Sequence, residues 1–176
     1  ADAMMERVHR HSCDLIRNSA RGAGLDYHLA VIINNSVNSL WGVNTAASAD
    51  GRKKGEALAN GINPSPGRDK EGLTAFLNSL LVPSIDNHAG SVQNMKIAPE
   101  LFHNHYPVLK NMLGSWFNRG GTQAMITVVN QKDLQDAYNN PEKWPNLIVR
   151  VGGFSARFVT LSRVVQKEIL ERTIHG

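Results

Sequence analysis

The chain has 176 residues, of which 41% are hydrophobic and 19% charged, and this composition predicts one folded domain rather than a disordered chain. The net charge of +4 is small and no run of five or six basic residues occurs, which disfavours a nucleic-acid-binding protein. The single cysteine, Cys13, excludes an internal disulfide and a multi-cysteine zinc site.

No apolar stretch approaches the roughly 18 residues that a membrane-spanning helix needs. The N-terminus also lacks the basic start and apolar segment of a signal peptide, so we expect a cytoplasmic protein. The first residue is Ala1 rather than methionine, which trimming, processing or the start of a fragment would each explain.

The first half of the chain contains two predicted helices and a long loop. A modest apolar stripe predicts a helix over 1–20, and a stronger one (Leu29, Ile33, Val37, Leu40 and Trp41) predicts an amphipathic helix over 25–41. The segment 42–72 holds six glycines and two prolines without periodicity. We expect it to be an ordered loop that docks through Leu58 and Ile62, because long loops in compact domains are usually functional or disordered.

The second half alternates predicted strands and helices. The patterns predict a helix over 72–81, a strand over 91–97, a helix around 109–117, a strand over 123–129, a helix from the N-cap Asn130 to about 138, a short β-branched run over 147–151 and a last helix from the N-cap Ser162 to 172. This alternation predicts an α/β fold.

Several residues that could carry chemistry have a simpler explanation. Cys13 lies in a helical pattern without a positioned partner, so we expect a structural, partly buried thiol. The pairs His9–His11 and His103–His105 have no spaced third ligand, so we expect no metal site. The segment 67–70, followed by Gly72 and Thr74, would suit an anion cradle, but a tight turn with solvated charges is at least as good an interpretation.

The run over 147–158 reads LIVRVGGFSARF, and it resembles the glycyl radical loop of the glycyl radical enzymes. That family includes pyruvate formate-lyase, the glycerol and propanediol dehydratases, choline trimethylamine-lyase, arylacetate decarboxylases and benzylsuccinate synthase. Further segments resemble the family in unbroken order over about 27–176: DGRKKGEALA at 50–59, GINP at 61–64, GRDK at 67–70, GLTA at 72–75, GGTQ at 120–123, VVN at 128–130, NPEK at 140–143 and the closing helix at 166–173.

The resemblance implies that Gly153 is the radical position, with Arg150, Val151, Gly152, Phe154 and Ser155 as the supporting loop. It implies a glycyl radical as a post-translational modification and no other bound cofactor or metal. A radical SAM activating enzyme would install the radical, and the iron–sulfur chemistry would be that partner's. Because such a radical must be kept from water and oxygen, we expect a deeply buried resting loop with Val151, Ile148 and Phe154 as apolar cover.

One departure from the family bears on what the chain is. Family members transfer the radical to a cysteine in a Gly-Cys-x-Glu-like motif several hundred residues earlier, which Cys13 does not match. We therefore expect the C-terminal part of a ten-stranded α/β barrel, or an exchangeable radical-carrying subunit. Residues 1–146 would belong to the barrel, and residues 147–176 would form the radical loop and closing helix.

The resemblance further implies a homodimer when complete, acting on a small-molecule substrate without nucleic acid or membrane. The motif at 150–155 favours the lyase, dehydratase and decarboxylase branch. A formate C-acetyltransferase, a fumarate-adding synthase and, outside enzymes, an anion-binding module remain open alternatives.

Overall fold

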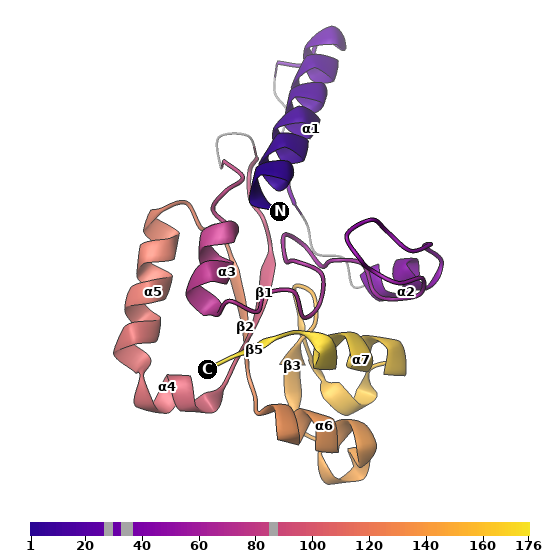
Figure 1. Ribbon diagram of the computed structural model, residues 1–176, viewed down its shortest axis with the longest axis vertical. Coiled ribbons are helices and arrows are strands. Elements are labelled where there is room, and N and C mark those ends of the chain that lie inside the picture. The colour runs from indigo at the N-terminus through magenta and orange to yellow at the C-terminus, as the bar shows by residue number, and fades with distance from the viewer. Residues whose placement is uncertain (27–29, 33–36, 85–87) are drawn as a thin grey trace.

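A computed structural model describes residues 1–26, 30–32, 37–84 and 88–176 (Figure 1). In chain order its elements are α1 (Asp2–Gly22), α2 (Asn38–Val43), α3 (Leu73–Ser79), β1 (Gln93–Ile97), α4 (Pro99–Asn104), α5 (Tyr106–Asn118), β2 (Ala124–Val128), α6 (Gln131–Asn139), η2 (Pro141–Lys143), β3 (Ile148–Arg150), β4 (Ser155–Arg157), η3 (Phe158–Thr160), α7 (Arg163–Glu171) and β5 (Ile174–His175).

The central sheet has three parallel strands in the order β2-β1-β5. All five residues of β1 are buried, and this strand pairs with β2 along its whole length and with β5 at Lys96 and Ile97. Parallel strands are typically covered by helices on their faces. The predicted α/β class is therefore confirmed, and the two residues of β5 form an edge strand beside the central β1.

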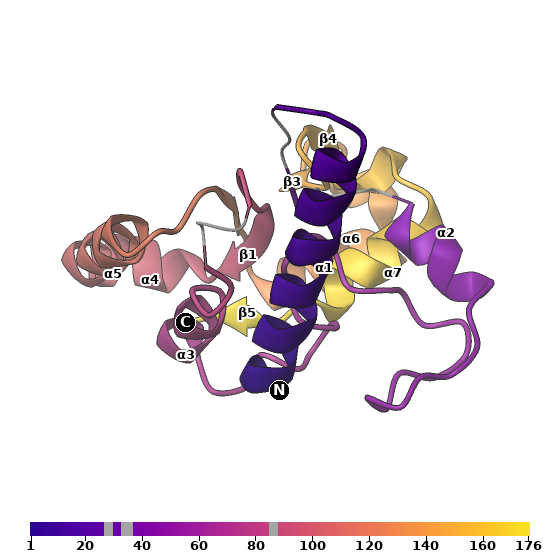
Figure 2. The ribbon, with the colours of Figure 1, turned by 90° about the horizontal axis from the view of Figure 1, so that it is seen from above.

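Two apolar cores flank this sheet. The first joins β1 to α3 and α5, which lie on the same side of it in Figures 1 and 2. Its buried members are Ile62, Leu73, Phe76, Leu77, Leu80, Met95, Ile97, Leu109 and Trp116. The second core joins α6, α7 and the two-stranded antiparallel hairpin β3–β4, with buried Val129, Leu134, Ala137, Val149, Val151, Phe158 and Ile169. The hairpin is thus packed on two helices.

The predicted helix over 25–41 is wrong for the described residues before Asn38. Ile32 forms a parallel bridge with Ser91, its N–H donates to the Gly90 carbonyl at 2.9 Å, and its carbonyl accepts from the Val92 N–H at 3.2 Å. Pairing with the extended segment before β1 has overridden the helical periodicity, and the helix is confined to α2. Leu29 and Ile33 lie outside the described residues.

The other predicted elements are confirmed within a few residues, and so is the ordered loop. After α2 ends, the loop up to Gly72 has neither helix nor strand, yet Ile62 is buried in the first core. Leu58 is held by Asn38, whose carbonyl accepts its N–H at 3.2 Å and whose side-chain amide donates to its carbonyl at 2.9 Å. Arg52 is buried and donates to backbone carbonyls inside the loop, including Glu56 at 2.8 Å.

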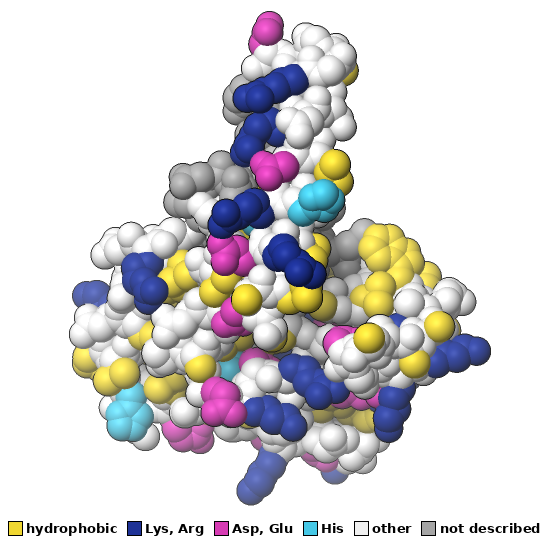
Figure 3. Space-filling view, turned by 45° about the horizontal axis from the view of Figure 1, so that its top comes forward, with side chains coloured by type: hydrophobic (Ala, Val, Ile, Leu, Met, Phe, Trp, Pro, Cys, Tyr) yellow, Lys and Arg dark blue, Asp and Glu magenta, His cyan; other side chains and the backbone are white. Residues whose placement is uncertain are grey.

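Helix α1 extends away from the rest of the fold, and Figure 3 shows side chains of both charges along it. Arg17 pairs with Asp14 at 2.8 Å, and Arg10 pairs with Glu6 two turns earlier. In the part of the chain that the structure describes, no helix is both long enough and apolar enough to cross a membrane.

Candidate functional site

The Gly152-Gly153 turn lies at the tip of the β3–β4 hairpin. Arg150 pairs with Ser155 at the end of the ladder, and the Arg150 guanidinium donates to the Ser155 hydroxyl at 3.0 Å. The Val151 N–H donates to the Phe154 carbonyl at 3.0 Å, which closes the turn. The structure therefore brings together the residues that the sequence singles out around Gly153.

Gly153 has a φ of +86°, in the left-handed region that side chains with a Cβ rarely adopt, whereas Gly152 lies outside that region. A Cβ placed on Gly153 would meet no heavy atom within 4 Å. Glycine is thus favoured at 153 by the backbone conformation and not by crowding.

Strand β2 holds the hairpin from one side through two side chains on the same face. The Thr127 hydroxyl accepts the Arg150 N–H at 3.0 Å, and the Met125 thioether sulfur accepts the Gly153 N–H at 3.1 Å. Met125 is 2% exposed, so this contact ties the turn to a fixed point in the interior.

Helix α7 holds the hairpin from the other side. The Arg172 guanidinium, at the C-terminal end of α7, donates to the carbonyls of Arg150 at 3.2 Å and Val151 at 3.1 Å. Glu168, one turn earlier, binds Arg172 through both carboxylate oxygens at 3.0 and 2.8 Å.

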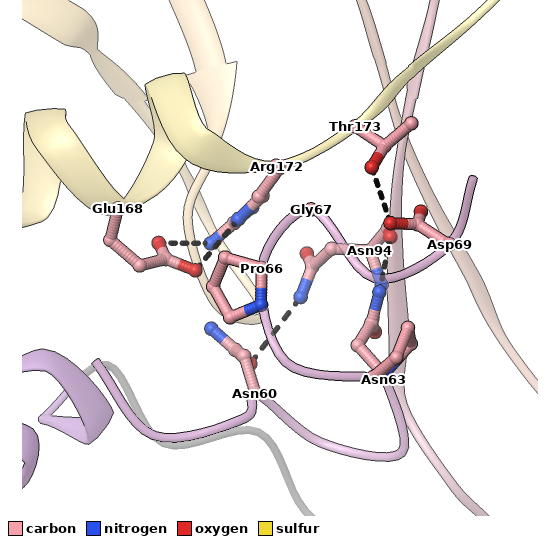
Figure 4. A pocket seen from close by; sticks show the side chains of 10 residues that line it. Asn60, Asn63, Pro66, Gly67, Asp69, Asn94, Glu168, Arg172 and Thr173 are labelled. Atoms are coloured by element: carbon pink, nitrogen blue, oxygen red, sulfur yellow. Dashed lines mark hydrogen bonds and ion pairs between the residues drawn. The ribbon is translucent and has the colours of Figure 1, made fainter. Parts of the chain in front are cut away.

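Beside this pair lies a polar cavity that joins the Gly-rich loop to the closing segment (Figure 4). The Asn63 side chain accepts the backbone N–H of Asn94 at 2.8 Å and donates to its carbonyl at 2.7 Å, as a neighbouring strand would. Asp69 accepts from the Thr173 hydroxyl and contacts His175 Nε2 at 3.1 Å. The cavity of about 20 Å³ has room for one water and not for a substrate.

Burial and hydrogen bonding have opposite effects on Asp69. Burial alone raises the pKa of its carboxyl, but hydrogen bonds from His175 and Thr173 outweigh it and hold the pKa below its usual value. Asp69 is therefore an ionised anchor for the last strand. This use of segment 67–70 disfavours the anion cradle, because the carboxylate at its centre would repel an anion.

The expected burial of the turn is wrong for this chain. Gly153 is exposed, and Ile148 and Phe154 are 52% and 48% exposed, so neither covers it. Val151 is buried, but in the core with α6 and α7. The described residues that contact the hairpin do so on its inward face.

Cys13 and His9, which the sequence offered as candidates for chemistry, have contacts that favour a structural role. Cys13 is 5% exposed, burial raises the pKa of its thiol, and its sulfur lies 3.7 Å from His9 Nε2. His9 also contacts His88, with Nε2 and Nδ1 3.1 Å apart, rather than His11. Among the described residues, no three His, Cys, Asp or Glu side chains gather as a metal site.

A family model described as "Glycine radical" matches residues 58–159, more than half of the chain. The chain belongs to the glycine radical family. The match begins in the Gly-rich loop, includes the whole β3–β4 hairpin and ends just after it. The family resemblance of the sequence is thereby confirmed.

Characterised members of the glycine radical family are similar in sequence and in structure. The PFL-like enzyme TdcE of Escherichia coli (strain K12) is 33% identical over 184 residues, which cover 96% of this chain and 24% of TdcE. The glycerol-bound B12-independent glycerol dehydratase of Clostridium butyricum matches with a TM-score of 0.77 and 36% identity, over 82% of this chain and 19% of that one. The chain thus spans about a quarter of the curated relative.

A third match is the hydroxyproline dehydratase of Clostridioides difficile, with its substrate trans-4-hydroxy-L-proline bound. It aligns with a TM-score of 0.77 and 29% identity, over 82% of this chain and 19% of that one. These structures are glycyl radical enzymes with the barrel of pyruvate formate-lyase, so the α/β fold of this chain is a part of that barrel.

Reasoning from the sequence missed the residues that hold the hairpin. Met125 lies in the predicted strand over 123–129 without any polar signal, and only the structure reveals its contact. Glu168 and Arg172 lie in the closing segment that resembles the family, at the i, i+4 spacing of a helical ion pair. That spacing could have indicated the pair, but not its carbonyl partners.

Proposed function

We propose that this chain is the radical-carrying C-terminal part of a glycyl radical enzyme, and that Gly153 stores the unpaired electron. The observation that carries the proposal is the placement of Gly153 with positive φ at the exposed tip of a braced hairpin, inside the family match. Residues 147–176 would form the radical unit, and residues 1–146 would belong to the barrel.

The chemistry of a backbone radical suits this position. Removing a Cα hydrogen leaves a planar centre delocalised over the amide nitrogen and the carbonyl, and only glycine allows this without a side-chain clash. The exposed tip would be accessible to an activating enzyme, for which the family resemblance supplies the radical SAM class. The glycyl radical would be the protein's own modification, with no further cofactor.

The radical would pass to a cysteine in the remainder of the enzyme. Cys13 suits this role poorly because it is buried on α1 beside His9. The same remainder would cover the exposed tip, including Phe154 and Ile148, and exclude water and oxygen during turnover. We also propose a cytoplasmic homodimer as the complete assembly.

The reaction we propose is a lyase or dehydratase reaction on a small molecule, started by hydrogen abstraction by the thiyl radical. Support comes from two structural neighbours that are dehydratases, of glycerol and of hydroxyproline. A second candidate is formate C-acetyltransferase chemistry, which the similarity to a PFL-like enzyme favours.

Exposure to oxygen tests the radical position. Dioxygen adds to a carbon-centred backbone radical, and decay of the peroxyl product breaks the chain at that residue. The native enzyme, activated without oxygen and then moved to air, should be cut at Gly153 and release a C-terminal piece that begins there. Intact-mass spectrometry measures this piece. Cleavage at another residue, or equal cleavage without activation, would refute the assignment.

A further inference from the structure

The two carbonyls that precede the Gly-Gly turn share one cation. Arg172 donates through Nη1 to the Arg150 carbonyl at 3.2 Å and through Nη2 to the Val151 carbonyl at 3.1 Å. Arg150 ends strand β3 and Val151 follows it, so their position fixes where the turn begins. The planar fork of a guanidinium holds two acceptors in a set geometry, which a lysine ammonium does not.

Glu168 orients that guanidinium. Its two carboxylate oxygens accept from Nε at 3.0 Å and from Nη2 at 2.8 Å, and the Glu168 and Arg172 side chains are 3% and 11% exposed (Figure 4). Removing two charges from water costs much of what their attraction returns, so such a pair is a weak source of stability. Its clear structural effect is to aim Arg172 at the hairpin.

Helix α7, which carries Glu168 and ends one residue before Arg172, is itself fixed to the rest of the fold. Its Leu170 carbonyl accepts from Lys96 Nζ at 3.1 Å and from the Gln131 side-chain amide at 3.2 Å. Lys96 lies on the central strand β1 and Gln131 begins α6. Contacts therefore run without a break from the sheet through α7 and Arg172 to the base of the turn.

We propose that Arg172, oriented by Glu168, is a positioning residue for the glycyl radical. It sets the placement of the hairpin and so the place of Gly153 relative to the rest of the enzyme. This inference rests on the proposed function of Gly153, and it adds a residue pair outside the 147–158 loop. Because a misplacement of about 1 Å can cost on the order of 100-fold in a reaction that depends on geometry, such a brace would matter for radical transfer.

The test uses Arg172→Lys, which keeps the charge and loses the fork, in the native enzyme. Hydrogen–deuterium exchange of peptides covering 150–156 should become at least about tenfold faster, since the brace on the loop is lost, while exchange in β1 stays unchanged. After anaerobic activation, the EPR doublet of the glycyl radical should decay with a half-life severalfold shorter than in the wild type. Glu168→Gln, which keeps the shape of the side chain, should shift both readouts in the same direction.

The exposed pair Lys167–Glu171 provides a matched control. It lies on the same helix at the same spacing, with its charged atoms 3.7 Å apart and its side chains 69% and 45% exposed. Lys167→Gln should leave loop exchange and radical half-life within twofold of the wild type, because an exposed pair of this kind contributes little.

Loop exchange separates the two hypotheses. One outcome is that the amides at 150–156 exchange slowly in the wild type and quickly in the variants while no doublet forms in the wild type. That result would refute the proposed function of Gly153 and support the structural contact between Arg172 and the hairpin. If amide exchange at 150–156 and the half-life of the doublet are the same in Arg172→Lys, Glu168→Gln and the wild type, the positioning role is refuted. Should Arg172→Lys fail to fold, Glu168→Gln alone decides between these results.

Discussion

The Gly153 N–H points at the Met125 thioether sulfur, 3.1 Å away across the gap between the hairpin and strand β2. Sulfur is a weak acceptor, and this one is 2% exposed, so the contact is protected from competition by water. It joins the residue of the turn whose backbone conformation favours glycine to a fixed side chain in the interior. The contact with Met125 on β2 therefore fixes the orientation of the Gly153 amide plane.

Met125→Leu tests that contact with little change in volume. We expect a loss of stability below about 1.5 kcal/mol, as for other volume-conserving core substitutions. The Gly153 amide should nonetheless exchange severalfold faster, because its acceptor is gone. Met95→Leu is the control, since Met95 is equally buried on β1 but packs in the first core with α3 and α5. Equal exchange at Gly153 in both variants would show that the sulfur does not hold the turn.

Asp69→Ala should release the C-terminal segment. Its carboxylate contacts Thr173 and His175, and loss of these buried hydrogen bonds should cost about 1–3 kcal/mol of stability. Because folding lowers the pKa of Asp69, the stabilisation is present above the unfolded value near about 3.9 and is lost as pH falls through the folded pKa. Thermal unfolding and carboxypeptidase digestion measure the effect.

The control for that variant is Glu71→Ala, an exposed acidic residue two positions further along the same loop. It should change neither the melting temperature nor the rate at which carboxypeptidase removes the C-terminus. If the two variants are digested at the same rate, Asp69 does not anchor strand β5.

Lys96 should make the free energy of unfolding depend on pH in the alkaline range. Burial first, and then the nearby Arg172 charge, lower the pKa of Lys96 from 10.5 to about 8. Between these values the unfolded chain holds a proton that the folded chain has released, so stability contributed by this residue rises with pH. The full effect is on the order of 3 kcal/mol.

Melting temperatures from pH 7 to pH 10 measure this dependence. The wild type should gain stability relative to Lys96→Met as pH rises through about 8. The difference between wild type and Lys110→Met, which alters an exposed lysine on α5, should stay constant. A constant difference for Lys96→Met as well would mean that Lys96 titrates as an exposed lysine does.

Local patterns in the sequence predicted most of the elements. The stripe of α5 and the caps Asn130 and Ser162 located helices correctly, although neither cap side chain bonds a backbone N–H. The patterns failed where long-range pairing decides. Ile32 lies in the segment 25–41 predicted as a helix yet pairs with Ser91, and β5 is a strand only because β1 lies beside it.

The candidate site was predictable as a motif but not as a structure. The segment 150–155 indicated Gly153 and its neighbours, because the family resemblance is concentrated there. Its exposure was not predictable, since Phe154 and Ile148 are apolar residues that sequence alone places inside. Met125 and Arg172 contact the turn from 28 and 21 residues away along the chain, in no pattern that a single sequence displays.

Electron paramagnetic resonance of the anaerobically activated native enzyme tests the role of Gly153 most directly. The wild type should give a doublet from the single Cα hydrogen of a glycyl radical. Gly152→Ala, one residue away and outside the left-handed region, should keep that doublet, while Gly153→Ala should abolish it. A doublet that persists in folded Gly153→Ala enzyme would contradict the account, because the unpaired electron would then reside on another glycine.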